Sequence, residues 1–181
     1  MQSLNKLTIV LHWLVAVCVL SLSAVGLYMV RTDAWPLYDT HKSIGVIVFA
    51  AVLARVGWTS RNGLPKPVRE FSRLEHAGAT IVHALLLACT VALPITGMAF
   101  SGASGHGFGV FGLPLFPEHP APAGHGAVIP VDGRLADWGQ VAHHVIGFAL
   151  LALVALHVAG ALKHHFIDRD RTLVRMLGRR R

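Results

Sequence analysis

The sequence predicts an all-α fold: a transmembrane four-helix bundle that forms a single integral membrane domain over residues 1–181. Hydrophobic residues make up 54% of the chain and its mean hydropathy is +0.57, which is too apolar for an ordinary soluble domain. Four stretches, at about 7–30, 41–59, 76–100 and 138–163, approach or exceed the roughly 20 apolar residues that cross a bilayer. An even number of spans places both termini on the same side of the membrane.

The first apolar run follows Lys6 and therefore resembles a secretory signal. The hydrophobic region of a signal peptide has about 7–15 residues and ends at a small-residue cleavage site, and this run is about twice as long. It also carries His12 and Trp13 near its start. We expect a retained helix.

The connections between the spans differ in length and composition. The first is short and contains Trp35 and Tyr38, which are typical anchors at a membrane interface. The second span ends before a segment containing Gly63, Pro65 and Pro67. The third connection, at 101–137, is long and rich in Gly and Pro, so it cannot be a span. Its apolar residues predict that this external loop folds over the mouth of the bundle.

The basic residues predict the orientation of the spans. Thirteen of the sixteen Lys and Arg residues lie before the first span, around the connection between the second and third, or after the fourth. They are Lys6, Arg55, Arg61, Lys66, Arg69, Arg73, Lys163, Arg169, Arg171, Arg175, Arg179, Arg180 and Arg181. Cytoplasmic segments retain positive charge, so both termini are predicted to be cytoplasmic. The net charge of +7 is then a topology signal, and we expect membrane lipid rather than nucleic acid as its partner.

Two histidines within the fourth span indicate a functional site. His143 and His157 are fourteen residues apart. At about 100° and 1.5 Å per residue, this spacing returns a helix to within roughly 40° of the same face after a rise of about 21 Å. Ionisable groups inside a membrane are costly, face the protein interior and indicate a functional site.

Histidines on other spans match these two in depth. His12 lies about one and a half turns inside the cytoplasmic end of the first span, at a depth similar to that of His157. His41 opens the second span at the external face, at a depth similar to that of His143. The sequence therefore predicts two histidine pairs, His12 with His157 and His41 with His143, one in each leaflet.

Paired imidazoles on opposite sides of a macrocycle are the ligands of a low-spin b haem, whereas zinc needs three or four ligands at one depth. No CxxCH motif is present, which excludes covalent c-type attachment. Gly45 and Gly147 each follow an expected ligand by four residues, where a macrocycle needs room. Small residues of this kind equally serve helix packing.

The other histidines have weaker assignments. His144 lies on the opposite face from His157, which predicts a neighbouring contact or the loop interface. For His76 and His83, which share a face of the third span, contact with a propionate or quinone competes with an ordinary buried hydrogen bond. His164 and His165 are expected at headgroups or propionates, as is Arg55. The loop histidines are expected to be solvated, and they are His106, His119 and His125.

Several strings together resemble the bacterial cytochrome b561 family, small di-haem inner-membrane proteins that include the superoxide oxidases. They are Leu11-His12-Trp13, His41-Lys42-Ser43-Ile44-Gly45, Pro94-Ile95-Thr96-Gly97, His143 to His157, and the tail from Ala161 to Asp168. The resemblance spans nearly the whole chain. It implies two non-covalent haem b groups, held by His12 with His157 and by His41 with His143. His83 falls where relatives also have a histidine, usually not a ligand.

The resemblance also implies a function at the bacterial inner membrane: electron transfer between a periplasmic donor, superoxide or a small redox protein, and the membrane quinone pool. In the superoxide oxidase branch the enzyme passes the electron of superoxide to ubiquinone. Two alternatives from other classes remain: a cytochrome b anchor subunit of a larger dehydrogenase or hydrogenase, and a non-haem transporter of metal ions or protons.

Overall fold

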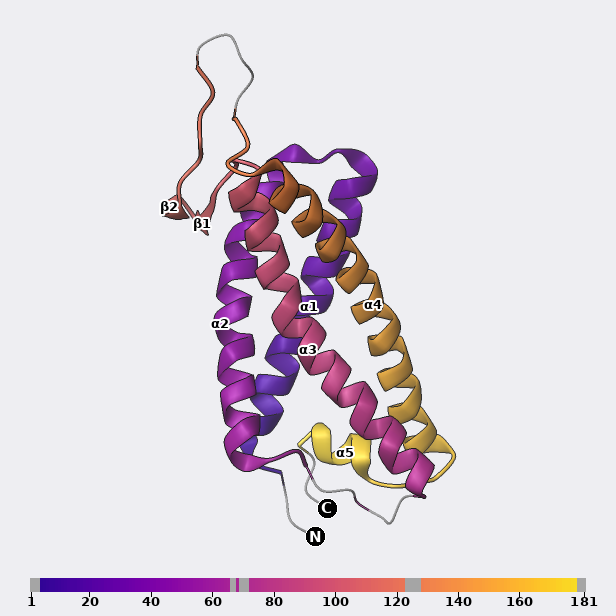
Figure 1. Cartoon of the computed structure of the whole chain (residues 1–181). Coiled ribbons are helices and arrows are strands. Elements are labelled where there is room, and N and C mark those ends of the chain that lie inside the picture. Colours follow the sequence, from indigo (N-terminus) through magenta and orange to yellow (C-terminus); the bar gives the residue numbers. More distant parts are fainter. Residues whose placement is uncertain (1–3, 66–67, 69–71, 123–127, 179–181) are drawn as a thin grey trace.

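A computed structural model describes residues 4–65, 68, 72–122 and 128–178. The residues discussed above that lie outside these ranges are Lys66, Pro67, Arg69, His125, Arg179, Arg180 and Arg181. Four long helices are α1 (Lys6–Thr32), α2 (Tyr38–Asn62), α3 (Arg73–Ala103) and α4 (Gly133–Phe166). All four are long and apolar enough to cross a membrane. The predicted four-helix transmembrane fold is therefore confirmed (Figure 1).

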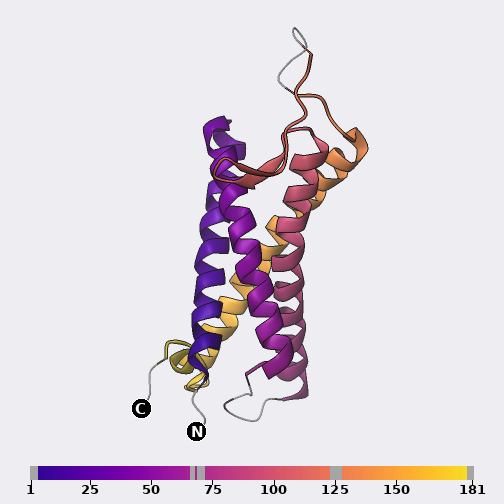
Figure 2. The same cartoon turned by 90° about the vertical axis from the view of Figure 1, so that its left-hand side faces the viewer.

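Four short elements were not predicted. They are the 3-10 turn η1 (Trp35–Leu37), the strands β1 (Phe108–Val110) and β2 (Leu113–Phe116), and the helix α5 (Thr172–Met176). The strands pair as an antiparallel hairpin inside the long loop, which spans only 104–132 because α3 and α4 extend further than expected. Both views place the two chain termini at one end of the bundle and this loop at the other (Figure 2). We call these the terminal end and the loop end.

Side-chain caps define where three of the long helices begin. Asn5 accepts a hydrogen bond from the backbone of Leu7, and Asp132 accepts one from Leu135. Ser72 and Glu75 form a reciprocal capping box at the start of α3. Each cap satisfies backbone N–H groups that have no partner within the helix. The long helices therefore begin at polar residues just outside their apolar segments.

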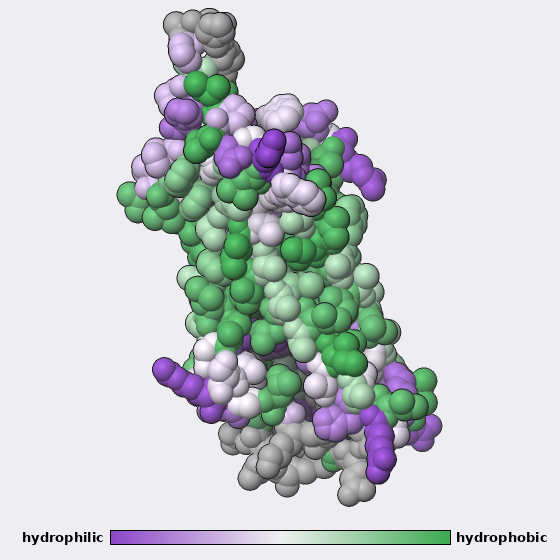
Figure 3. Space-filling view, in the orientation of Figure 1, coloured by the Kyte–Doolittle hydropathy of each residue, from purple (hydrophilic) through white to green (hydrophobic). Residues whose placement is uncertain are grey.

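The helices pack as two pairs, α1 with α2 and α3 with α4. Val15 of α1 and Val48 and Val52 of α2 form a small buried core. Many large apolar side chains are instead exposed on the outside of the bundle. Figure 3 shows them as a broad apolar belt between two polar ends. This inversion is what a bilayer requires, because lipid replaces the hydrophobic core as the apolar environment.

Gly139 allows a close approach of α3 and α4. A Cβ atom at this position would lie 2.8 Å from the backbone nitrogen of Phe100 and 3.0 Å from its Cα. We expect Gly139→Ala to destabilise the protein by about 1–3 kcal/mol, because backbone cannot yield as a flexible side chain can. Thermal unfolding in detergent checks this. Gly160→Ala, also on α4 but with open space at its Cβ, is the control and is expected to leave the melting temperature unchanged or slightly raised.

Candidate functional site

Four polar side chains from four different helices converge near the terminal end. His12 comes from α1, Arg55 from α2, His83 from α3 and His157 from α4, and all four are half-buried. The ring centres of His12 and His157 are 6.2 Å apart, and those of His83 and His157 are 5.1 Å apart. The structure therefore brings together the predicted pair and adds a third imidazole to it.

Two hydrogen bonds orient this terminal-end cluster. His83 Nδ1 lies 2.7 Å from the carbonyl oxygen of Ala79, so Nδ1 carries the proton and Nε2 is left with its lone pair. Arg55 Nη2 lies 3.1 Å from His12 Nδ1. A guanidinium only donates, so His12 Nδ1 accepts in this arrangement. Arg55 thus lies within α2 against His12 and does not belong to the loop that follows.

The loop-end pair is formed by His41 of α2 and His143 of α4, with ring centres 6.4 Å apart. His143 Nδ1 donates to the carbonyl oxygen of Leu93, at 2.9 Å, and the hydroxyl of Thr96 lies 3.4 Å from the same nitrogen. His41 Nδ1 is buried and has no hydrogen-bond partner among the described residues. One imidazole of this pair is therefore fixed by α3, and the other retains an unsatisfied nitrogen.

Three residues of α3 that support His143 were missed as site residues: Leu93, Thr96 and Gly97. A Cβ at Gly97 would lie 3.0 Å from Cε1 of His143, so only glycine leaves room for the ring. Thr96 and Gly97 belong to the string Pro94 to Gly97, which was noted only for the resemblance. Its internal proline and its glycine are disfavoured in a helix, and that was the available signal.

The spacing of the rings tests whether these residues suit a metal. An imidazole nitrogen binds a first-row metal ion at about 2.0 Å, and the ring centre lies about 1.15 Å behind it, so rings on opposite sides of one ion have centres about 6.3 Å apart. The separations of 6.2 Å and 6.4 Å match this value, and the 5.1 Å between His83 and His157 is too short. The Nδ1 bond of His143 also leaves Nε2 available to a metal.

The two glycines predicted to make room differ in their surroundings. A Cβ at Gly45 would meet nothing within 4 Å, whereas at Gly147 it would lie 3.7 Å from a methyl group of Leu93. Gly45 therefore faces open space, and Gly147 faces α3. Gly26 of α1, which was not singled out, approaches His41, since its Cβ would lie 3.4 Å from Cε1 of that ring.

The remaining described histidines lie apart from the two pairs. His144 is exposed, as are His106 and His119 in the loop. His76 is exposed and bonds only locally to Thr80, although it shares a helix face with His83. His83 differs from His76 in that a ring from another helix, His157, lies beside it. Among the described residues no ring lies beside His76, which is about 10 Å further along α3, near the helix end.

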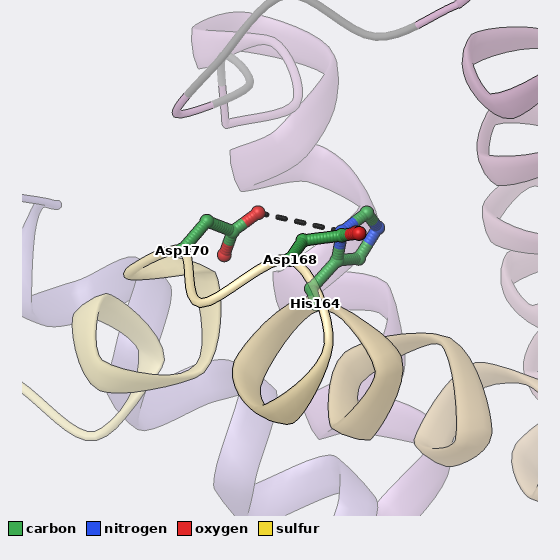
Figure 4. Close-up of side chains that lie close together, drawn as sticks. All are labelled: His164, Asp168 and Asp170. Atoms are coloured by element: carbon green, nitrogen blue, oxygen red, sulfur yellow. Dashed lines mark ion pairs between the residues drawn. The ribbon is translucent and has the colours of Figure 1, made fainter.

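His164 contributes to an ion-pair cluster in the tail. Its Nδ1 lies 2.8 Å from Asp168 and 3.3 Å from Asp170, and Figure 4 shows the three side chains turned toward one another. These groups have the types and proximity of metal ligands. Lys163 lies 2.9 Å from Asp168 and 2.5 Å from Glu75 of α3, so positive charge is already present. We interpret the cluster as the contact that folds the tail back under the bundle, where Trp13 donates to the carbonyl oxygen of Met176.

Four apolar spanning helices with imidazoles paired across the bundle define a membrane protein of the b-type cytochrome class. The profile of the family described as prokaryotic cytochrome b561 matches residues 3–179, and the chain belongs to this family of haem-containing membrane electron-transfer proteins.

Curated relatives agree with this assignment. "Cytochrome b561 homolog 2" of Escherichia coli (strain K12) is 34% identical over 173 residues, covering 93% of this chain and 87% of the relative. "Cytochrome b561 homolog 1" of the same organism is 26% identical over the full length of both chains. "Probable superoxide oxidase CybB" of Yersinia pestis is 27% identical, covering 97% of this chain and 96% of the relative. The resemblance noted from the sequence is thereby confirmed.

Proposed function

We propose that the chain binds two b haems, one held by His12 and His157 and the other by His41 and His143, and transfers single electrons between a periplasmic donor and membrane quinone. The observation that carries this proposal is the separation of the two ring pairs, 6.2 Å and 6.4 Å, at opposite ends of the bundle. Along α4 the pairs are separated by a rise of about 21 Å, which is most of the hydrocarbon thickness.

A b haem bound at each of these histidine pairs would supply one-electron redox chemistry. The chain orients the ligands. His143 keeps Nε2 available because Leu93 holds its Nδ1 proton. To serve as a ligand through Nε2, His12 would need the same tautomer, with its proton on Nδ1, and Arg55 could then not donate to that nitrogen. The guanidinium of Arg55 would instead be available to a haem propionate. His83, beside His157, is a polar group available to quinone or to a propionate at the same end.

The orientation proposed from charge places the terminal end in the cytoplasm and the loop end in the periplasm of a bacterium with this chain in its inner membrane. Thirteen of sixteen Lys and Arg residues are then cytoplasmic or near that face. Lys42, next to His41, is one of three basic residues on the opposite side. Its ammonium group pairs with Asp39 at 2.8 Å. The carboxylate of Asp39 therefore offsets the positive charge of Lys42 beside the loop-end pair.

For the donor we propose superoxide, with ubiquinone as acceptor, because a relative covering nearly the whole chain is named a probable superoxide oxidase. In this reaction two superoxide ions give up one electron each and leave as O₂, and ubiquinone takes two electrons and two protons. We expect superoxide to reduce the oxidised protein within milliseconds in stopped-flow mixing, followed by reoxidation on addition of ubiquinone. The haem absorbance measures both steps.

Superoxide dismutase added before mixing is the control for this experiment and is expected to abolish the reduction. A small periplasmic redox protein is the alternative donor. If superoxide leaves the protein oxidised while ubiquinol reduces it, the proposed donor is wrong, although the haem ligands proposed above are unaffected.

A further inference from the structure

The hairpin formed by β1 and β2 has only apolar side chains, although it lies in a loop between two spans, where side chains usually face water. The segment from Gly107 to Pro117 contains neither a charged side chain nor a hydrogen-bonding one. Phe111 and Leu113 are each 66% exposed, and Leu115 is 57% exposed. A two-stranded hairpin is marginally stable in water, and exposed apolar side chains do not stabilise it there. Something apolar is therefore needed to cover this face.

The turn of the hairpin places an aromatic side chain at its tip against the usual backbone preference. Phe111 and Gly112 both have positive φ, 43° and 88°, as the two central residues of a type I′ turn do. The first of these positions favours Asn, Asp or Gly, and a bulky residue there is strained. Phenylalanine at this position therefore makes the turn less stable than Asn, Asp or Gly would, and it places an apolar ring on the exposed tip of the hairpin.

The opposite side of the hairpin is attached to the bundle. The rings of Phe108 and Phe116 stack 5.9 Å apart, and both would contact a Cβ placed at Gly102 of α3. The backbone N–H of Phe111 donates to Ser43 Oγ at 3.0 Å, and the hydroxyl of Ser101 donates to the carbonyl of Gly107. The hairpin thus has one side fixed on α2 and α3, and its other side points away from the protein.

The attachment to Ser43 sets the depth of the hairpin. Ser43 follows Tyr38, the first residue of α2, by five positions, which is about 7.5 Å along the helix axis. The turn therefore lies beside the first turns of a spanning helix, below its end. In Figure 3 the apolar surface continues from the belt onto the region of β1 and β2 at the upper left.

We propose that this hairpin is inserted in the membrane interface at the loop end, with Phe111, Leu113 and Leu115 against the acyl chains of that leaflet. Continuity with the lipid-facing belt and the depth fixed by Ser43 favour lipid as the occupant. A surface that binds another protein reversibly is usually about as polar as the rest of the protein, and this hairpin carries no polar side chain. The hairpin then anchors the long loop beside the loop-end histidine pair.

Spin labels on single cysteines test the insertion in nanodiscs that hold one protein each. Cys18 and Cys89 are first replaced by alanine, and labels are attached at Leu113→Cys, Leu115→Cys and, as the control just beyond the hairpin, Glu118→Cys. Oxygen concentrates in lipid and a neutral nickel complex stays in water. We expect severalfold more collisions with oxygen than with nickel at 113 and 115, and the reverse at 118.

A second variant separates insertion from folding of the hairpin. Phe111→Asn suits the turn better, so the hairpin remains formed, but it removes the aromatic tip. We expect it to shift the label at 115 toward the nickel complex. Nickel dominating at 113 in the parent protein would place the hairpin in water and overturn the proposal. Exclusion of both reagents would mean that protein covers the hairpin, and that result also overturns it.

Discussion

His41→Ala is expected to remove one haem and leave the other, so that the haem content of the purified protein falls from two per chain to one. His41 and His143 form the loop-end pair, and neither ring contacts the terminal-end cluster about 21 Å away along α4. His12→Ala should give the mirror result, with loss of the terminal-end haem alone. Haem content per protein together with the reduced-minus-oxidised spectrum measures both variants.

His83→Ala is the matched control, because His83 lies in the same cluster as His12 but only 5.1 Å from His157. Since that separation is too short for two rings on opposite sides of one ion, this variant should retain both haems. Loss of a haem in His83→Ala with retention of both in His12→Ala would assign the ligand to α3. Zinc in place of iron in the parent protein would contradict the haem proposal and favour a non-haem transporter.

The sequence predicted the spans well because an apolar run of sufficient length has few other uses. It also matched the depths of the four histidines, since depth follows from counting residues at 1.5 Å each. The separations of 6.2 Å and 6.4 Å are consistent with that matching. The depth of a residue along its own helix is a local property and can be derived from the sequence.

The rotation of each helix about its axis relative to its neighbours is not a local property, and the sequence did not predict it. Nothing in the chain indicates that α3 turns His83 toward His157 while His76, on the same face, remains exposed. The contact of Arg55 with His12 likewise depends on how α1 packs on α2. Both arrangements are set by packing between helices, which composition and spacing do not specify.

The tail shows the same limit. His164 was expected at a headgroup or a propionate because it lies beside Lys163 at the membrane exit. The structure pairs it with Asp168 and Asp170, only four and six residues later, because the chain reverses direction after α4. A spacing of four residues was a signal for the first of these pairs.

Gly97→Ala is expected to weaken binding of the loop-end haem by about 10–100-fold, the range for changes to groups that orient a metal ligand. The added Cβ would lie 3.0 Å from Cε1 of His143 and 3.1 Å from Nδ1. The ring must then move, and its bond to the Leu93 carbonyl, 2.9 Å long, lengthens or breaks. Titration of the haem-depleted protein with haem, followed by the absorbance of each site, gives the affinity.

Alanine is favoured over glycine in a helix by about 1 kcal/mol, so the substitution by itself should stabilise α3. Weaker haem binding in Gly97→Ala would therefore come from the contact with His143 and not from general destabilisation of the helix. Gly78→Ala on the same helix is the control: its Cβ meets nothing within 4 Å, so both haems should bind as in the parent protein. The electron paramagnetic resonance spectrum of the loop-end haem should change in Gly97→Ala, since a rotated imidazole alters the ligand field, and the terminal-end signal should not. An unchanged loop-end spectrum and affinity would show that His143 is not held by α3 in the loaded protein.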